Sequence, residues 1–203
     1  DDAFIGEGFI VIIGTGADAF AQSLALGSTS SLTLSSGSLS LTNTSFVDGT
    51  VILSGGSLSS AANLNLNGAF NWSGGSLLGS GALITDGTST LSTITTKFVN
   101  MDWTNNGIVD WNDGDLQVLG STVLLTNAGS GIFNAASAGN ELQLNNGSFV
   151  NLGDYNADAS HTIRQVSIGA TSFDNDGTVT IASAQTLTVE APGTDTGLWT
   201  GAG

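Results

Sequence analysis

Short alternations of apolar and polar residues recur along most of the chain. "SLAL", "SLTL" and "SLSL" begin their first leucines at positions 24, 32 and 39, and "LNL" at 64–66 has the same form. Such alternation is typical of a β-strand with one buried and one solvated face. The intervening "SSG", "SGG", "DG" and "NG" segments consist of residues that favour tight turns. No window has helix formers at helical spacing, so the pattern predicts an all-β protein with almost no helix.

A second pattern recurs at a longer interval. An apolar residue, a spacer, Asn and later Gly occur in "WTNNGIVDW", "LTNAGSGIF", "FVNLGDY" and "FDNDGTVTI", which start at residues 103, 125, 149 and 173. The asparagines are Asn105, Asn127, Asn151 and Asn175, at intervals of 22, 24 and 24 residues. In the amino-terminal half, Leu24, Leu32, Leu39 and Phe46 follow at steps of 8, 7 and 7, a total of 22. Three short strands therefore make one repeat of 22–24 residues.

This repeat favours a β-solenoid over an antiparallel sandwich, because a sandwich has no need to copy residue types over such intervals. Parallel strands connected in this way are normally right-handed. We therefore expect residues 20–203 to form a right-handed parallel β-solenoid (β-helix) with three strands per coil. At about 23 residues per coil the chain has roughly eight or nine coils.

Stacked coils should place like side chains in columns, about 4.8 Å apart. The expected amide column is Asn105, Asn127, Asn151 and Asn175, with side-chain hydrogen bonds from coil to coil. The expected ring columns are Phe46 with Phe70, Phe149 with Phe173, and Trp111 with Phe133 and Tyr155. Trp72 alternates with Phe70, so both are expected inside.

The amino-terminal segment differs in composition from the Gly-, Ser- and Asn-rich remainder of the chain. "FIGEGFIVIIG" at 4–14 is its most hydrophobic stretch. We expect residues 1–19 to fold over the first coil as a cap, or to be a strand donated to a neighbouring copy. The side chains expected in such an assembly are Phe4, Ile5, Phe9, Ile10, Val11, Ile12 and Ile13, with Trp199 near the other end of the chain.

The net charge of the chain limits the classes of partner that it is expected to bind. The chain has 17 acidic residues but only Lys97 and Arg164 as basic side chains, a net charge of −15. Nucleic-acid binding is not expected, because phosphate needs a basic surface. The absence of cysteine excludes disulfides and zinc–thiolate sites. The longest apolar run, "FIVII" at 9–13, is far below the roughly 20 residues of a membrane span, so we expect no membrane insertion.

The sharpest candidate for chemistry is "DWNDGD" at 110–115. Asp110, Asp113 and Asp115 are the carboxylates, and Trp111 is a sugar platform if the protein degrades polysaccharide. The alternative is a solvated turn built from turn-forming residues. Calcium is the one ion with candidate ligands, namely these three residues and the pairs Asp154/Asp158 and Asp174/Asp176. We favour the turn and expect no catalytic residue and no cofactor.

Two further patterns are weaker. His161, the single histidine, lies in "ASHTIRQ" with no nucleophile motif near any serine, so we expect it on the surface. The Ser/Thr-rich "TSTLSTITTK" at 88–97 is compatible with a flat hydroxyl face of the kind that binds ice. Its register does not recur on successive coils, so a polar outer face is the preferred interpretation.

The segment at 68–94, "GAFNWSGGSLLGSGALITDGTSTLSTI", resembles a pattern of large secreted bacterial proteins. Its members here are Phe70, Trp72, Gly74, Gly75, Leu77, Gly79, Gly81 and Leu83. It is similar to the β-solenoid regions of filamentous-haemagglutinin-like adhesins and autotransporter passengers, and the similarity extends over about residues 20–203. The resemblance implies an extracellular or cell-surface location. The calcium-binding Gly-Gly-x-Gly-x-Asp repeat is missing.

The expected function is therefore structural: a subunit or segment of an extracellular fibre, filament or stalk, with self-association or a longer solenoid at its ends. Two alternatives stay open. One is an adhesin-type module that binds glycans or surfaces, and the other is a polysaccharide-degrading β-helix enzyme. Fold alone does not choose among them.

Overall fold

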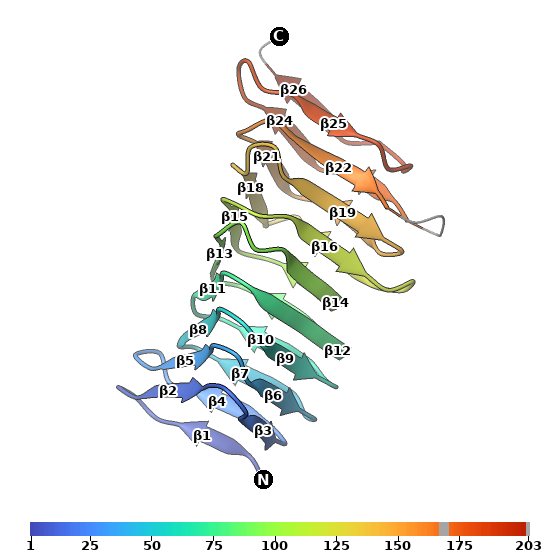
Figure 1. Cartoon of the computed structure of the whole chain (residues 1–203). Helices are drawn as coiled ribbons and strands as arrows, with labels where there is room; N and C mark the ends of the chain where they lie inside the picture. Colours follow the sequence, from blue (N-terminus) through green and yellow to red (C-terminus); the bar gives the residue numbers. More distant parts are fainter. Residues whose placement is uncertain (167–170, 202–203) are drawn as a thin grey trace.

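The computed structural model describes residues 1–166 and 171–201, and all regular structure in them is β-strand. The strands form about nine turns of a solenoid with about three strands per coil (Figure 1). The all-β parallel solenoid expected from the sequence is confirmed. No helix among the described residues has the length and apolar character needed to cross a membrane.

The strands stack on three faces. On the first face lie β1 (Ala3–Ile5), β4 (Leu24–Leu26), β7 (Ser45–Val47), β10 (Leu64–Leu66), β17 (Leu124–Asn127), β20 (Ser148–Asn151) and β23 (Phe173–Asn175). On the second lie β2 (Ile10–Ile13), β5 (Ser31–Leu34), β8 (Thr50–Leu53), β11 (Phe70–Trp72), β13 (Thr88–Leu91), β15 (Ile108–Trp111), β18 (Ile132–Ala135), β21 (Asp154–Ala157), β24 (Thr178–Ile181) and β26 (Leu198–Gly201). On the third lie β3 (Asp18–Ala21), β6 (Ser38–Leu41), β9 (Ser57–Ser60), β16 (Leu116–Leu119), β19 (Glu141–Asn145), β22 (His161–Gln165) and β25 (Leu187–Val189).

Two longer strands, β12 (Gly75–Thr85) and β14 (Lys97–Asn105), run from the third face onto the first without a break. They join these faces into one 16-stranded sheet, while the second face is a separate 10-stranded sheet. With neighbouring strands about 4.8 Å apart, nine coils make a rod roughly 40 Å long.

The coil length varies along the rod. The last inward position of the first face is filled, coil by coil, by Ile5, Leu26, Val47, Leu66, Thr85, Asn105, Asn127, Asn151, Asn175 and Asp195. Differences between successive numbers run from 19 to 24. The expected 22–24 residues hold between positions 105 and 175, and the coils of the amino-terminal half are shorter. Apart from β12 and β14, the strands have three to five residues each, so most of the difference in coil length lies in the corner loops.

The inward side chains form one continuous core. Leucines dominate the first coils, and large rings fill the later ones; the rings of Trp72, Trp103, Trp111, Phe133, Phe149 and Tyr155 are fully buried. Phe149 lies directly over Phe173 in register, with ring centroids 5.4 Å apart. Phe70 and Trp72 both point inward, as expected from their alternation.

Phe46 is the clear exception to the expected ring columns. It pairs in register with Ala25 on one side and Asn65 on the other, not with Phe70, and its side chain is 58% exposed. Ser45 and Val47 are the inward residues of β7. The expected 22-residue step was one residue too long here, because the true step is 21. A shift of one residue moves a strand side chain to the opposite face.

Residues 1–19 are continuous with the solenoid. β1, β2 and β3 pair in parallel with β4, β5 and β6 of the next coil. The segment that we expected to be a cap or a donated strand thus forms most of the first coil of this chain. Donation to a neighbouring copy stays a prediction.

Candidate functional site: the open first coil and the polar column

The four repeated asparagines form a buried amide ladder. The first three donate an Nδ2 hydrogen to the Oδ1 atom of the asparagine one coil on: Asn105 to Asn127 at 2.9 Å, Asn127 to Asn151 at 2.8 Å and Asn151 to Asn175 at 2.8 Å. These three also donate to backbone carbonyl oxygens at the corner, as Asn151 does to Gly153 and Thr178 at 3.2 Å. The ladder therefore joins the coils and gives the corner carbonyls a side-chain donor; the carbonyl of Gly153 also accepts the backbone N–H of Thr178 at 2.8 Å.

The ladder has a polar residue of another kind at each end. Thr85 precedes it, donating its hydroxyl to Asn105 Oδ1 at 3.3 Å and accepting from Trp103 Nε1 at 3.0 Å. Asp195 follows it and accepts from Asn175 Nδ2 at 3.1 Å. The same column is aliphatic in the earlier coils, so one inward position changes from apolar to polar at Thr85.

The carboxylates of 110–115 do not converge on one point. Asp110 accepts from Asn134 Nδ2 at 2.8 Å, and Asp113 from Asn140 Nδ2 at 3.2 Å. Asp115 accepts from the backbone N–H of Glu141 at 2.9 Å. Each therefore links its own coil to the next. Among the described residues, no three histidine, aspartate or glutamate side chains lie together as a potential metal site.

The other acidic pairs behave in the same way. Asp174 accepts the backbone N–H and the hydroxyl of Thr194 at 2.7 and 2.9 Å. Burial raises the pKa of Asp174, but bonds from Ser172 and Thr194 outweigh it and hold the pKa below its ordinary value. Asp176 accepts a hydrogen bond from the Thr196 hydroxyl.

The remaining acidic pair lies at the two ends of β21. Asp154 begins that strand with its side chain exposed, and Asp158 follows it. Calcium binding at these positions stays a prediction.

Trp111 is fully buried, so it is not a platform for sugars. The expected column of Trp111, Phe133 and Tyr155 is only partly formed. Phe133 and Tyr155 are in register and stack at 5.4 Å. Trp111 is paired with Ala135 instead, two residues along the strand, and meets Phe133 edge-on at 6.4 Å.

His161 is buried rather than on the surface, which corrects the expectation. Its Nδ1 atom lies 2.7 Å from the Ala159 carbonyl oxygen and its Nε2 atom 2.6 Å from the Tyr155 hydroxyl. A carbonyl only accepts, so Nδ1 carries the proton and Nε2 accepts from Tyr155. Burial lowers the pKa of His161, although the Ala159 carbonyl opposes the shift. Burial raises the pKa of Tyr155. The pair is neutral and fully hydrogen-bonded, which is a structural role.

Lys97 is likewise buried, at a corner. Its ammonium group donates to the carbonyl oxygens of Thr93, Thr95 and Asp113 at 2.7–2.9 Å. Burial lowers its pKa to about 8, against the favourable charges of Asp113 and Asp115. Gly114 faces the ammonium, where a Cβ atom would lie 2.8 Å from Nζ. Lys97 thus holds the corner together.

The first coil has an open end that exposes the core. An apolar recess of about 220 Å³ is lined there by inward side chains that include Ala3, Ile5, Val11, Ile13, Ala19 and Ala21. We call it the end recess. Of the residues expected in assembly, Ile5, Val11 and Ile13 point into it. Phe4, Phe9, Ile10 and Ile12 point outward and are 60–81% exposed.

The first coil also has an open backbone edge. The carbonyls of Ile5, Phe9 and Ile13 accept hydrogen bonds from the second coil. In a parallel ladder the backbone groups of alternate residues point to opposite sides. The N–H and C=O groups of Phe4, Ile10 and Ile12 therefore point away from the second coil, toward the open edge.

Trp199 lies at the other end of the rod. It is in register with inward-facing Val179, and its ring meets that of Phe173 edge-on at 6.4 Å. Its indole nitrogen donates to Asp195 at 2.6 Å, and 39% of the residue is exposed. Trp199 thus covers part of the last ring column while still presenting surface to solvent.

Searches for similar proteins found no matching family model, no matching curated protein and no matching solved structure.

Proposed function

We propose that the chain is an extracellular structural protein, a subunit or segment of a surface fibre, filament or stalk whose solenoid is continued at its open first coil. The supporting observation is the end recess together with the unpaired backbone edge beside it. Both are complementary to one more parallel coil, which another copy or a longer chain would supply. In general, an exposed sheet edge is a template for pairing with a strand of another chain.

Burial of apolar side chains at the open first coil favours the addition of a further coil. A further coil would cover Ile5 and Val11, which are only half-buried at the end of the rod. Each half-covered aliphatic side chain gains roughly 1 kcal/mol on full burial. Backbone pairing along β1, β2 and β3 adds the specificity of register. The extracellular part of the proposal is supported by the resemblance of residues 68–94 to haemagglutinin-like and autotransporter solenoids.

The edge is tested with Ile12→Pro and a matched Ile12→Thr control. Proline removes the N–H group that points to the open edge and is tolerated on edge strands, whereas threonine keeps it. We expect the wild-type chain and Ile12→Thr to form end-to-end rods, and Ile12→Pro to sediment as a monomer. Sedimentation velocity and negative-stain electron microscopy give the readout. A wild-type chain that stays monomeric at high concentration, or equal assembly by Ile12→Pro, would contradict continuation of the solenoid by another copy.

A second candidate, an adhesin-type binding module, is favoured by one observation. Four phenylalanines of the first three coils are exposed: Phe4 and Phe46 on the first face, Phe20 on the third, and Phe9 just before β2. Exposed apolar side chains can form contacts with sugars or partner proteins. A glycan array on which wild-type chain and a variant with all four residues changed to serine give the same signals would count against it.

A further inference from the structure

The outward side of the first face carries a groove between two phenylalanines. Phe4, Ala25 and Phe46 lie in register on the neighbouring strands β1, β4 and β7. Phe4 is 81% exposed and Phe46 is 58% exposed. Two strand spacings place their backbones about 9–10 Å apart. The small Ala25 side chain between them leaves the floor of the groove open. Stacking at the end of the rod does not cover this side.

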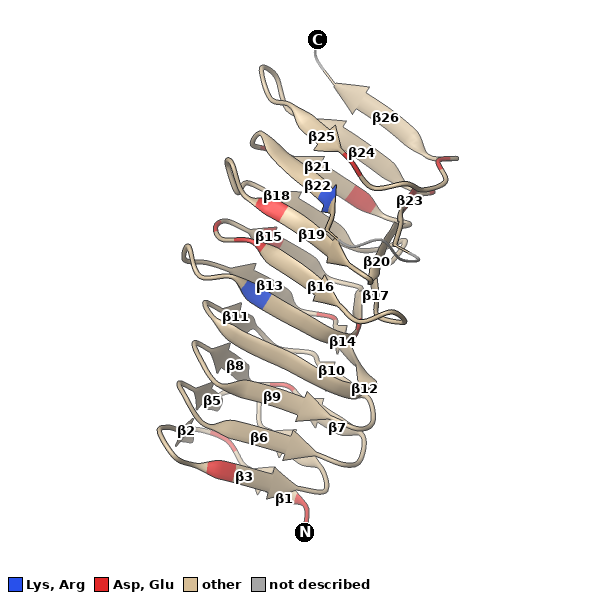
Figure 2. Cartoon of the chain, turned by 45° about the vertical axis from the view of Figure 1, so that its right-hand side comes forward, with Lys and Arg blue, Asp and Glu red and all other residues tan. Residues whose placement is uncertain are grey.

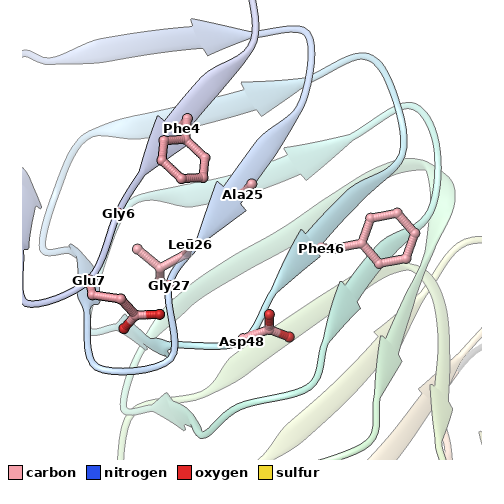
Figure 3. Close-up of a pocket in the computed structure, with 8 residues that line it drawn as sticks. All are labelled: Phe4, Gly6, Glu7, Ala25, Leu26, Gly27, Phe46 and Asp48. Atoms are coloured by element: carbon pink, nitrogen blue, oxygen red, sulfur yellow. The ribbon is translucent and has the colours of Figure 1, made fainter.

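The groove is acidic at one end. It has a volume of about 300 Å³, and beyond the strand ends it is bounded by Gly6, Glu7, Gly27 and Asp48. Figure 3 shows Phe4 and Phe46 on either side of Ala25, with Glu7 and Asp48 at the corner. An apolar channel therefore leads to two carboxylates.

Both carboxylates are held in place by neutral donors of the next coil. Glu7 accepts the N–H groups of Ser28 and Thr29 at 3.1 and 2.8 Å and the Thr29 hydroxyl at 2.5 Å. The bonds from Thr29 lower the pKa of Glu7. Asp48 accepts from Asn67 Nδ2 at 2.7 Å. None of these donors carries a positive charge that would compensate the two carboxylates.

The lysine and the arginine of the chain belong to other coils. Lys97 begins β14 and Arg164 lies in β22, and the blue segments of Figure 2 lie well along the rod from the first coils. All charged side chains before residue 97 are acidic. A cation that pairs with Glu7 and Asp48 through a basic side chain must therefore come from another molecule.

We propose that this groove, the Phe4–Phe46 groove, binds a basic segment of a partner protein. The alkyl part of a lysine or arginine lies over Ala25 between the two rings, and its charged group meets Glu7 and Asp48. Lysine and arginine side chains have an apolar stem followed by a charged head, which matches the apolar floor and the acidic end of the groove. Aromatic faces attract cations, and carboxylates form charge-assisted bonds with them. The net charge of −15 favours approach of a basic partner and disfavours a second copy of this chain.

The probe is a capped pentapeptide, acetyl-Gly-Ser-Arg-Ser-Gly-amide, titrated into ¹⁵N-labelled protein. The amide signals of Ala25 and Gly27 report on the groove. We expect them to shift with the arginine peptide, and to shift far less with a peptide that carries neutral citrulline instead.

A double change of Phe4→Ser and Phe46→Ser should weaken binding of the arginine peptide about tenfold. Phe20→Ser is the matched control, because Phe20 is 78% exposed on the third face and does not line the groove.

Two further variants separate the groove from general charge attraction. Asp48→Asn should weaken binding severalfold. Asp86→Asn removes the same charge at the same corner position, where Asp86 accepts from Asn106 at 2.8 Å, and should leave binding unchanged. Ala25→Leu fills the floor without changing charge and should weaken binding as well.

Three results would overturn the proposal. One is equal loss of affinity in Asp48→Asn and Asp86→Asn, which means non-specific attraction. Another is no shift of Ala25 and Gly27 with the arginine peptide. The third is a shift of these signals with cellohexaose, a neutral glycan, but not with the peptide, which makes the groove a sugar site. Asp48→Asn and Ala25→Leu lie in the second and third coils, away from the open edge, so their effects on groove binding are separate from assembly.

Discussion

Single inward polar residues are the most constrained positions of this chain. In the amide ladder each asparagine both gives and accepts a side-chain bond, so every buried amide has partners on two sides. Asparagine is suited to the position because it carries a donor and an acceptor on one short side chain. Aspartate occurs only as the last member, Asp195, which accepts without having to donate.

Asn151→Asp tests this directly. The carboxylate would accept from Asn127 but would face the oxygens of Gly153, Asn175 and Thr178 without a hydrogen to give. A buried carboxylate that faces these oxygens without a counter-charge should lower the free energy of unfolding by about 3 kcal/mol or more. Asn156→Asp, on the partly exposed outer side of β21, is the control and should cost far less. Equal losses in urea unfolding would refute the role assigned to the ladder.

His161 predicts a specific pH dependence. Its pKa is lowered in the folded protein, mainly by burial, so the unfolded chain binds the proton more readily. The stabilising contribution is therefore present above the unfolded pKa of about 6.5 and is lost as the pH falls below it. From pH 7 to 5.5 the free energy of unfolding should drop by about 1 kcal/mol. His161→Asn keeps a donor for Ala159 and should show little change over this range; the same slope in both proteins would argue against a neutral buried histidine.

Sequence reasoning found some of these residues and missed others for physical reasons. The asparagine spacing predicted the ladder because identical residues recur at coil length. Phe46 was misplaced because a one-residue error in coil length reverses the direction of a strand side chain. His161 and Lys97 gave no periodic signal. Their partners, Tyr155 and the carbonyls of Thr93, Thr95 and Asp113, lie across a corner and depend on how the coil closes.

The strands are held at one corner by a column of glycines. Between the first and second faces, a Cβ atom at each would overlap the carbonyl oxygen of the glycine one coil before. The members are Gly49, Gly68, Gly87, Gly107, Gly153, Gly177 and Gly197. Close approach of stacked backbones, not an unusual φ angle, requires glycine here. This column runs from one half of the chain to the other, so it is the sequence signal that would have given the amino-terminal register correctly.

Gly153→Ala tests how closely the backbones of successive coils approach each other at this corner. The added methyl group would press on the carbonyls of Gly131 and Ala128, and overpacking of this kind typically costs about 1–3 kcal/mol. Gly129→Ala is the matched control two residues before Gly131, because its nearest neighbour is the Leu152 carbonyl at 3.9 Å. It should change stability by less than about 0.5 kcal/mol. Similar thermal unfolding of the two variants would show that the coils have room to separate.

Across the whole molecule, many of the carboxylates that give the chain its negative charge accept hydrogen bonds from neutral donors of the following coil. Asp2 accepts from the Ser23 hydroxyl at 2.7 Å, Asp18 from the Ser38 hydroxyl at 2.6 Å and Asp86 from Asn106 at 2.8 Å. The ion pairs of Arg164 with Glu141 and Glu190 are largely exposed and contribute little. Stacking register, rather than ion pairing, therefore both organises the charges and stabilises the rod.

The same register makes end-to-end continuation directly measurable. Ile10 and Leu198 occupy the same outward row of the second face, on the first and last strands of that sheet, and both are exposed. A copy stacked in register would bring them about 5 Å apart, within the reach of a disulfide. The native chain has no cysteine to interfere.

Oxidation of an Ile10→Cys/Leu198→Cys double variant is the decisive measurement. We expect a ladder of covalent multimers on a non-reducing gel, which is converted to monomer on reduction. A control with Ile10→Cys and Asn71→Cys, the latter in the middle of the rod, should give no such ladder. Monomer alone from the double variant, or equal ladders from both proteins, would contradict the continuation of the solenoid from copy to copy.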